Sequence, residues 1–303
     1  MLMCLRTVLT LLLLIADVAR EVVGDEGTRS GRTGVTGACT REKLIERRRN
    51  KRMDVEEEKP IILALPGPLF PPIDFDHASE EEGPKRGSGT IKKRFSIAGR
   101  NMYLKGEPHV DSSDHAEQTA GSIWDCSLVL AKYLEKHSQR YLKDHHVLEL
   151  GSGQGVVGIA CGLAGAKKVT LSDVNAALHC LRDNAVLNEL ESVVKVKELD
   201  WLRAHDHVRD LEPADLIVAA DVVWIDQLVG PFVKTLTLAF EASKAVLKEV
   251  HVILCHKTRS NHTDNILFEL LRESNFSWKE EPIENCHEEY RSSEIRIFHI
   301  FRS

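Results

Sequence analysis

Three glycines at alternate positions, Gly151, Gly153 and Gly155, follow an apolar run that ends at Leu150. A second apolar stretch begins directly after the last glycine. This order predicts a buried strand, a tight turn and a helix. Because glycine has no Cβ, the backbone N–H groups of such a turn can approach a bound ligand closely. The turn therefore predicts a ligand site, with Gly151, Ser152 and Gly153 among the residues that contact the ligand.

An acidic residue precedes the turn and narrows the kind of ligand. Glu149 lies two residues before the first glycine, where its carboxylate would repel a pyrophosphate and attract a cation. The usual dinucleotide pattern also needs a third glycine where this chain has Val156. Both observations favour S-adenosylmethionine, which carries an ammonium and a sulfonium, over a nicotinamide dinucleotide.

A second predicted strand, 168–172, is followed by an acid. Asp173 lies 22 residues after Gly151, at a position from which a carboxylate can accept hydrogen bonds from both hydroxyls of a ribose. Asp173 could instead simply cap the helix that we expect from about Asn175. Taken alone, the two interpretations of Asp173 are equally good. Together with the glycine turn, the ribose interpretation is favoured.

Four further segments carry residues suited to the same site. They are 121–134 with Trp124, 199–201 with Trp201, 215–224 with Ala220, Asp221 and Trp224, and 258–264 with Arg259 and Asp264. With the glycine turn, these segments resemble a class I, seven-strand S-adenosylmethionine-dependent methyltransferase. Within that class, the chain resembles the protein-lysine methyltransferases of methyltransferase family 16. The resemblance covers residues 94–303, about two-thirds of the chain.

The resemblance implies a role for each of these residues. Trp124 is expected beside the cofactor, and Trp201 against its adenine. Asp221 would orient the acceptor amine, and Trp224 would form a wall of the lysine channel. The family usually has tyrosine or phenylalanine where this chain has Trp224. Tryptophan keeps a π-face that can contact a cation, so the reaction class is retained, while the substrate and the number of methyl groups added stay open.

Predicted strands and helices alternate along residues 94–303, which indicates an α/β fold with right-handed crossovers. We expect strands near 146–150, 168–172, 193–198, 215–220, 250–255, 276–281 and 294–301, and helices near 121–136, 156–163, 226–247 and 263–274. The fold class is a Rossmann-like seven-stranded, mostly parallel sheet with helices on both faces and an antiparallel C-terminal edge hairpin. A separate hairpin is expected at 94–105. In such a sheet ligands bind outside the carboxyl ends of the strands, where Gly151, Asp173, Trp201 and Asp221 all fall.

Residues 1–93 differ in composition from the rest, so we expect a leader and linker there and a methyltransferase domain at 94–303. An apolar run after Arg6 imitates a secretory signal. The basic run 47–52 is read as a solvated charge run, with a nuclear localisation signal as the alternative. Met53 offers an alternative start. We expect a cytoplasmic protein, with nuclear, organelle and secretory routes left open by these segments.

The amino-acid composition limits the kinds of molecule that the chain is expected to bind. A net charge of −6 argues against nucleic-acid binding. Seven cysteines, an odd number without a C-x-x-C pair, indicate a reducing compartment. The fourteen histidines show no spacing suited to a metal, and we expect no metal site and a monomer.

The favoured function is S-adenosylmethionine-dependent methylation of a protein lysine, on a substrate such as a chaperone or a translation factor, which relatives commonly modify. One alternative is a methyltransferase with another acceptor, such as a protein histidine or a small molecule. The other is a non-catalytic module that only binds S-adenosylmethionine. The intact glycine turn and Asp221 count against this last alternative.

Overall fold

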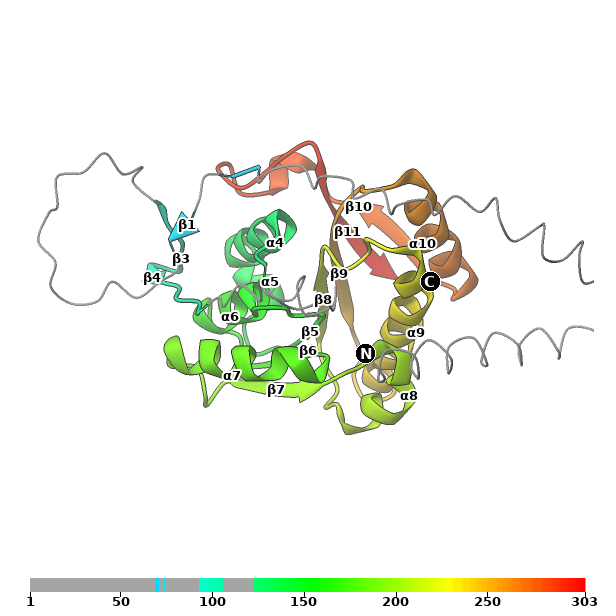
Figure 1. The fold of residues 1–303 in the computed structure, drawn as a ribbon, viewed down its shortest axis with the longest axis horizontal. Coiled ribbons are helices and arrows are strands. Elements are labelled where there is room, and N and C mark those ends of the chain that lie inside the picture. The colour runs from blue at the N-terminus through cyan, green and yellow to red at the C-terminus, as the bar shows by residue number, and fades with distance from the viewer. Residues whose placement is uncertain (1–68, 71–72, 75–92, 106–121, 303) are drawn as a thin grey trace, which may run out of the picture. The chain divides into compact units, whose positions relative to one another are not determined.

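The computed structural model describes residues 69–70, 73–74, 93–105 and 122–302. One sheet has the strand order β10-β11-β9-β8-β5-β6-β7 (Figure 1). Its strands are β5 (His146–Leu150), β6 (Lys168–Asp173), β7 (Val194–Glu198), β8 (Leu216–Ala220), β9 (His251–Lys257), β10 (Ser277–Glu280) and β11 (Ile295–Phe301). Strands β5 to β9 pair in parallel, whereas β11 is antiparallel to β9 and β10 is antiparallel to β11. The predicted seven-stranded, mostly parallel sheet with its antiparallel edge hairpin is confirmed.

Helices cover both faces of this sheet. They are α4 (Asp125–Lys136), α5 (Ser138–Tyr141), α6 (Val156–Leu163), α7 (Leu178–Leu187), α8 (Ala204–His207), α9 (Asp226–Lys244) and α10 (Asn261–Glu273). Side chains alternate along a strand, so Val147 of β5 joins the core under α4 and α6, and its neighbour Leu148 joins the core under α9 and α10. Figure 1 shows the two groups of helices on opposite sides of the strands.

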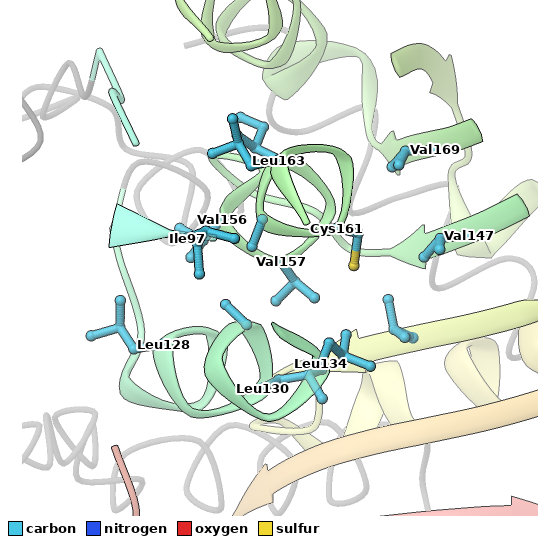
Figure 2. Close-up of a cluster of buried hydrophobic side chains, with 14 of the residues drawn as sticks. Ile97, Leu128, Leu130, Leu134, Val147, Val156, Val157, Cys161, Leu163 and Val169 are labelled. Atoms are coloured by element: carbon cyan, nitrogen blue, oxygen red, sulfur yellow. The ribbon is translucent and has the colours of Figure 1, made fainter. Parts of the chain in front are cut away.

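The core on the first face holds the glycine turn in place. Figure 2 shows Leu130 and Leu134 of α4 facing Val157 and Cys161 of α6. All four side chains are fully buried. Since α6 follows the glycine turn directly, packing of this helix against α4 and the sheet fixes where the turn ends.

Two short strand pairs precede α4. Strands β3 (Ser96–Ile97) and β4 (Arg100–Asn101) form an antiparallel hairpin, which confirms the hairpin predicted at 94–105. Strands β1 (Ile73–Asp74) and β2 (Lys93–Arg94) pair in parallel.

Two asparagines of α7 and its C-terminal end hold the chain that leaves the hairpin. The side chain of Asn188 accepts the N–H of Tyr103 at 3.0 Å and donates to the same residue's C=O at 2.6 Å. Asn184 accepts the N–H of Lys105 at 2.7 Å and donates to the C=O of Gln154 at 2.9 Å. Asn184 therefore links this segment to the glycine turn.

Two helices differ most in length from the prediction. α4 begins at Asp125 instead of residue 121, because Trp124 is extended, with φ −101° and ψ 142°. Residue 121 itself lies outside the described residues. α9 ends at Lys244, although the N–H of Leu247 still bonds the C=O of Ser243 at 2.9 Å, so helix-like bonding continues towards the predicted end.

Part of the predicted linker contacts the domain. The N–H of Leu69 donates to Asp125 at 3.0 Å, and the rings of Phe70 and Tyr290 lie 5.5 Å apart. The domain boundary at residue 94 stays a prediction, as do the signal-like start, the basic run and the alternative start, which lie outside the described residues. No helix in the described ranges is long and apolar enough to span a membrane.

Candidate active site

A cavity of about 250 Å³ opens at the carboxyl ends of the central strands. Ten of the residues that the sequence singled out for the site line this cavity: Trp124, Glu149, Gly151, Ser152, Gly153, Asp173, Trp201, Ala220, Asp221 and Trp224. Arg259 and Asp264, which the sequence grouped with the same site, do not line it. The ten lining residues come from five separate segments of the chain. The parallel sheet brings them together because the carboxyl ends of its strands meet at one edge.

The glycine turn has a backbone that other residues rarely adopt. The φ angles of Gly151, Gly153 and Gly155 are +70°, +53° and +84°. At Gly151 a Cβ would also lie only 3.0 Å from the ring of Trp201. Glycine is therefore required at this position for both its conformation and its lack of volume.

Asp173 fastens the turn to the end of β6. One of its carboxylate oxygens accepts the N–H of Gly153 at 2.8 Å, and the other accepts the N–H of Val174 at 2.7 Å. The cap alternative is wrong, because neither the 3-10 turn at Asn175–Ala177 nor α7 has a side-chain cap. Burial raises the pKa of Asp173, and the two N–H donors oppose that shift. The carboxylate is thus held at the cavity wall with lone pairs still available to a ligand.

Glu149 is engaged within the protein and also lines the cavity. Its side chain is 2% exposed and accepts the N–H of Gly158 at 2.9 Å. Burial raises the pKa of Glu149 to about 8, despite the lowering effect of that N–H. The expected contact of Glu149 with the methionine end of a cofactor stays a prediction. The bond to Gly158 is a second role, which the sequence pattern did not indicate.

Two tryptophans line the cavity, one after β7 and the other after β8. Trp201 opens a 3-10 turn, Trp201–Arg203, that Asp200 caps by accepting the N–H of Leu202 at 2.9 Å. The ring of Trp201 lies 5.3 Å from that of Phe232 of α9, which fixes its orientation. Trp224 is half-buried and lines the cavity after β8.

Asp221 has a strained backbone and a paired side chain. Its φ is +54°, an unfavourable value for a residue with a side chain, and its N–H bonds the C=O of Cys255 at 3.0 Å. The side chain is 1% exposed, and its Oδ2 accepts a hydrogen bond from Arg259. Its other oxygen, Oδ1, is buried and has no hydrogen-bond partner among the described residues. A buried acceptor without a partner on a cavity wall fits a ligand that donates an N–H.

Arg259 is the residue whose contacts sequence reasoning missed. The sequence placed it in a loop after the fifth strand, but nothing in its spacing indicated that it would pair with Asp221, 38 residues away. Its guanidinium also lies over the ring of Trp124, 5.3 Å from the ring centre. The carboxylate that we expected to orient an acceptor amine is therefore one half of an ion pair.

A polar cluster supports the loop that carries Arg259. Asp264 accepts hydrogen bonds from Thr258 and bonds buried His256, both at 2.7 Å. Arg296 of β11 donates to Thr258 at 2.8 Å. Ser260 then caps α10 by accepting the N–H of Thr263. The loop is held on both sides of Arg259.

The geometry agrees with comparison to known proteins. The sequence profile of a family described as lysine methyltransferase matches residues 110–274. This chain belongs to that lysine methyltransferase family. Membership implies S-adenosylmethionine as the cofactor, and the open glycine turn, the fixed carboxylate of Asp173 and the unpartnered Oδ1 of Asp221 fit such a ligand.

Several curated proteins are similar to parts of the chain. Protein N-lysine methyltransferase METTL21A of Danio rerio is 37% identical over 123 residues, 39% of this chain and 54% of that protein. Protein-lysine N-methyltransferase EEF2KMT of Mus musculus is 30% identical over 178 residues, 54% of this chain and 52% of that protein. Histone-arginine methyltransferase METTL23 of Mus musculus is 39% identical over 103 residues, 33% of this chain and 40% of that protein. The chain spans about half the length of the curated relatives it matches, or less.

Proposed function

We propose that this chain is an S-adenosylmethionine-dependent protein-lysine N-methyltransferase. The observation that carries the proposal is the cavity at the carboxyl edge of the sheet, which is lined by the glycine turn, by the fixed carboxylate of Asp173 and by Asp221, whose side chain is paired with Arg259. Family membership and the names of METTL21A and EEF2KMT support lysine as the acceptor.

The cofactor end of the cavity would lie along the glycine turn. Asp173 would accept hydrogen bonds from the ribose, and Trp201 would lie against the adenine. Glu149, Gly151, Ser152 and Gly153 would surround the methionine end, with Ala220 beside them. When bound, S-adenosylmethionine supplies a methyl group on a sulfonium, so the protein needs little acid–base machinery of its own.

The acceptor end would lie between Trp124, Asp221 and Trp224. A free lysine has a pKa of about 10.4, so the acceptor must lose a proton before it can react. The apolar rings keep water away from the amine, and Oδ1 of Asp221 can accept one of its N–H bonds. Trp224 stands where the family usually has tyrosine or phenylalanine, and unlike a tyrosine it places no hydroxyl at this end.

Substrate, assembly and location belong to the proposal as well. We propose a protein substrate, with a chaperone or translation factor as the first candidates, and a monomeric enzyme in the cytoplasm. We propose no nucleic-acid partner and no metal. METTL23 is named as a histone-arginine methyltransferase, so arginine is the acceptor to test against lysine.

The proposal is tested by methyl transfer from tritiated S-adenosylmethionine into cell lysate, with the full chain and with Asp173→Ala as the matched control. The proposal is supported if the full chain transfers tritium to lysate protein and the Asp173→Ala variant does not. Label confined to small molecules would assign another acceptor. Cofactor binding by calorimetry with no label anywhere would assign a non-catalytic binding module.

A further inference from the structure

Three segments meet at the acceptor end of the cavity around one guanidinium. Arg259 follows β9, Asp221 follows β8, and Trp124 precedes α4. Arg259 bonds Oδ2 of Asp221 and lies 5.3 Å from the centre of the Trp124 ring. Arg259 does not itself line the cavity, whereas Asp221 and Trp124 do. Any effect of Arg259 on an acceptor must therefore act through these two residues.

The ion pair of Asp221 and Arg259 should persist when an acceptor binds, because both side chains are largely buried. The side chains of Asp221 and Arg259 are only 1% and 16% exposed, so separating them would leave a buried charge without a partner. The cluster of His256, Thr258 and Asp264 also holds the loop in position from behind.

The ion pair of Asp221 and Arg259 sets the net charge at the acceptor end of the cavity. Arg259 cancels the charge of Asp221, and among the described residues the thiols of Cys126 on α4 and Cys255 on β9 also lie near the pair. Burial raises the pKa of Cys126 well above its usual value, so this thiol is neutral. Glu149, Asp173 and Asp200 line the cofactor end of the same cavity. A bare carboxylate at Asp221 would favour an ammonium, whereas the paired carboxylate offers one oxygen and little net charge.

We propose that Arg259 is a positioning residue that makes the acceptor site select the neutral amine: it fixes Oδ1 of Asp221 towards one N–H and removes the charge that would hold an ammonium. This inference rests on the proposed function. The acceptor ammonium gives one proton to water. The amine lone pair then forms the N–C bond while the S–C bond breaks and its electron pair stays on sulfur.

Replacement of Arg259 by methionine separates charge from shape. In Arg259→Met the bare carboxylate should raise the pKa of a bound amine by about one to three units. The acid side of the pH–rate profile should then move to higher pH by that amount. Arg259→Lys restores the charge and should restore the profile. Arg272→Met is the matched control, because Arg272 also lies over a tryptophan, Trp278, at 5.7 Å, but on α10 away from the cavity.

A binding measurement needs no turnover. The full chain is saturated with S-adenosylhomocysteine and titrated with n-butylammonium at pH 7 by calorimetry. Arg259→Met should bind this probe at least about tenfold more tightly than the natural chain, which equals one pKa unit. Arg259→Lys and Arg272→Met should match the natural chain. For the pH–rate profile described above, in contrast, the methyl acceptor is total lysate protein.

A folded Arg259→Met variant with unchanged probe affinity and an unmoved profile would overturn the proposal and leave Arg259 a structural role. If that variant does not fold, the comparison moves to Asp221→Asn with and without Arg259→Met. In the Asp221→Asn background, Arg259→Met removes the positive charge that repels n-butylammonium, so the double variant should bind this probe more tightly than Asp221→Asn alone. An equal affinity for the probe would overturn the proposal. Absence of methyl transfer to protein would instead contradict the proposed function, while the binding measurement would still decide the role of Arg259.

Discussion

Two carboxyl groups hold the glycine turn and the helix that follows it. Asp173 bonds the N–H of Gly153 inside the turn, and Glu149 bonds the N–H of Gly158 in the helix that follows it. Both groups are buried at the cavity, so their pKa values are raised. At the scale of single residues, the site is therefore a set of backbone N–H groups that two acidic side chains hold in place. Because the same two side chains titrate, the affinity of the site for a ligand should depend on pH.

Asp173→Ala should weaken binding of S-adenosylmethionine. The variant loses the proposed hydrogen bonds to the ribose and the bond that fixes Gly153, together worth about 1–3 kcal/mol. That loss corresponds to roughly 5- to 150-fold in Kd. Calorimetric titration measures it, and an unchanged Kd would show that Asp173 serves the turn alone.

Glu149 should make the free protein less stable as pH rises. Its folded pKa is about 8, above the value of about 4.3 in an unfolded chain, so between these values the folded state holds the extra proton. Stability from this group is complete below pH 4.3 and is lost as pH rises towards 8, by up to about 1.4 kcal/mol per pH unit. Glu149→Gln should remove this part of the slope in urea unfolding between pH 5.5 and 8.5. Identical slopes for the two proteins would contradict the assignment.

The turn depends on how closely α6 packs on β6. At Gly158 a Cβ would lie 2.1 Å from Cδ2 of Leu171 and 2.9 Å from Oε2 of Glu149. No real Cβ makes the first of these contacts, so the helix and the strand lie as close as they do only because residue 158 is glycine. At the scale of elements, this contact sets the distance between the turn and the sheet.

Gly158→Ala should lower stability by about 1–3 kcal/mol through overpacking. The matched control is Gly230→Ala in α9, where the nearest atom to a Cβ is 4.0 Å away, and where alanine should be neutral or stabilising by about 1 kcal/mol. Thermal unfolding compares the two variants. A Gly158→Ala protein as stable as the control would mean that α6 can shift at little cost.

The order of elements follows from the sequence because central strands such as β5, β8 and β9 are short, mainly apolar runs, whereas helices such as α4, α9 and α10 are amphipathic. The same rule places Gly151, Asp173 and Asp221 at strand ends, where the structure has them. The Asp221–Arg259 pair could not be predicted, because contacts across the sheet between distant segments carry no local pattern. The start of α4 was misplaced for a similar reason, since Trp124 is extended where it meets Arg259.

At the scale of the whole chain, the described residues before residue 94 contact the domain but do not line the cavity. The cavity is lined only by residues from Ser122 onwards among those the structure describes. Leu69 and Phe70 nevertheless contact Asp125 and Tyr290 of the domain. The contact with Asp125 lies directly beside Trp124, at the start of α4.

A chain that begins at Pro84 should keep its affinity for S-adenosylmethionine, because no described cavity residue is removed. It should unfold at a Tm lower than that of a chain beginning at Leu65, since it loses the contacts of Leu69 and Phe70. For a loss of about 1 kcal/mol the shift is roughly 2–4 °C. A more than tenfold loss of affinity on truncation to Pro84 would show that the preceding segment contributes to the site.

The central claim is that this chain transfers methyl groups to protein lysines at the Asp221 end of the cavity. The most direct measurement is peptide mass spectrometry of cell lysate incubated with S-adenosylmethionine carrying a deuterated methyl group, using the full chain and Asp221→Asn. The account predicts label on lysine ε-amines, and at least about tenfold slower transfer by Asp221→Asn, equal to about 1.4 kcal/mol in the barrier. Calorimetry should find the cofactor affinity of the variant near normal. Label on arginine or histidine, or transfer by Asp221→Asn at the natural rate, would contradict the account.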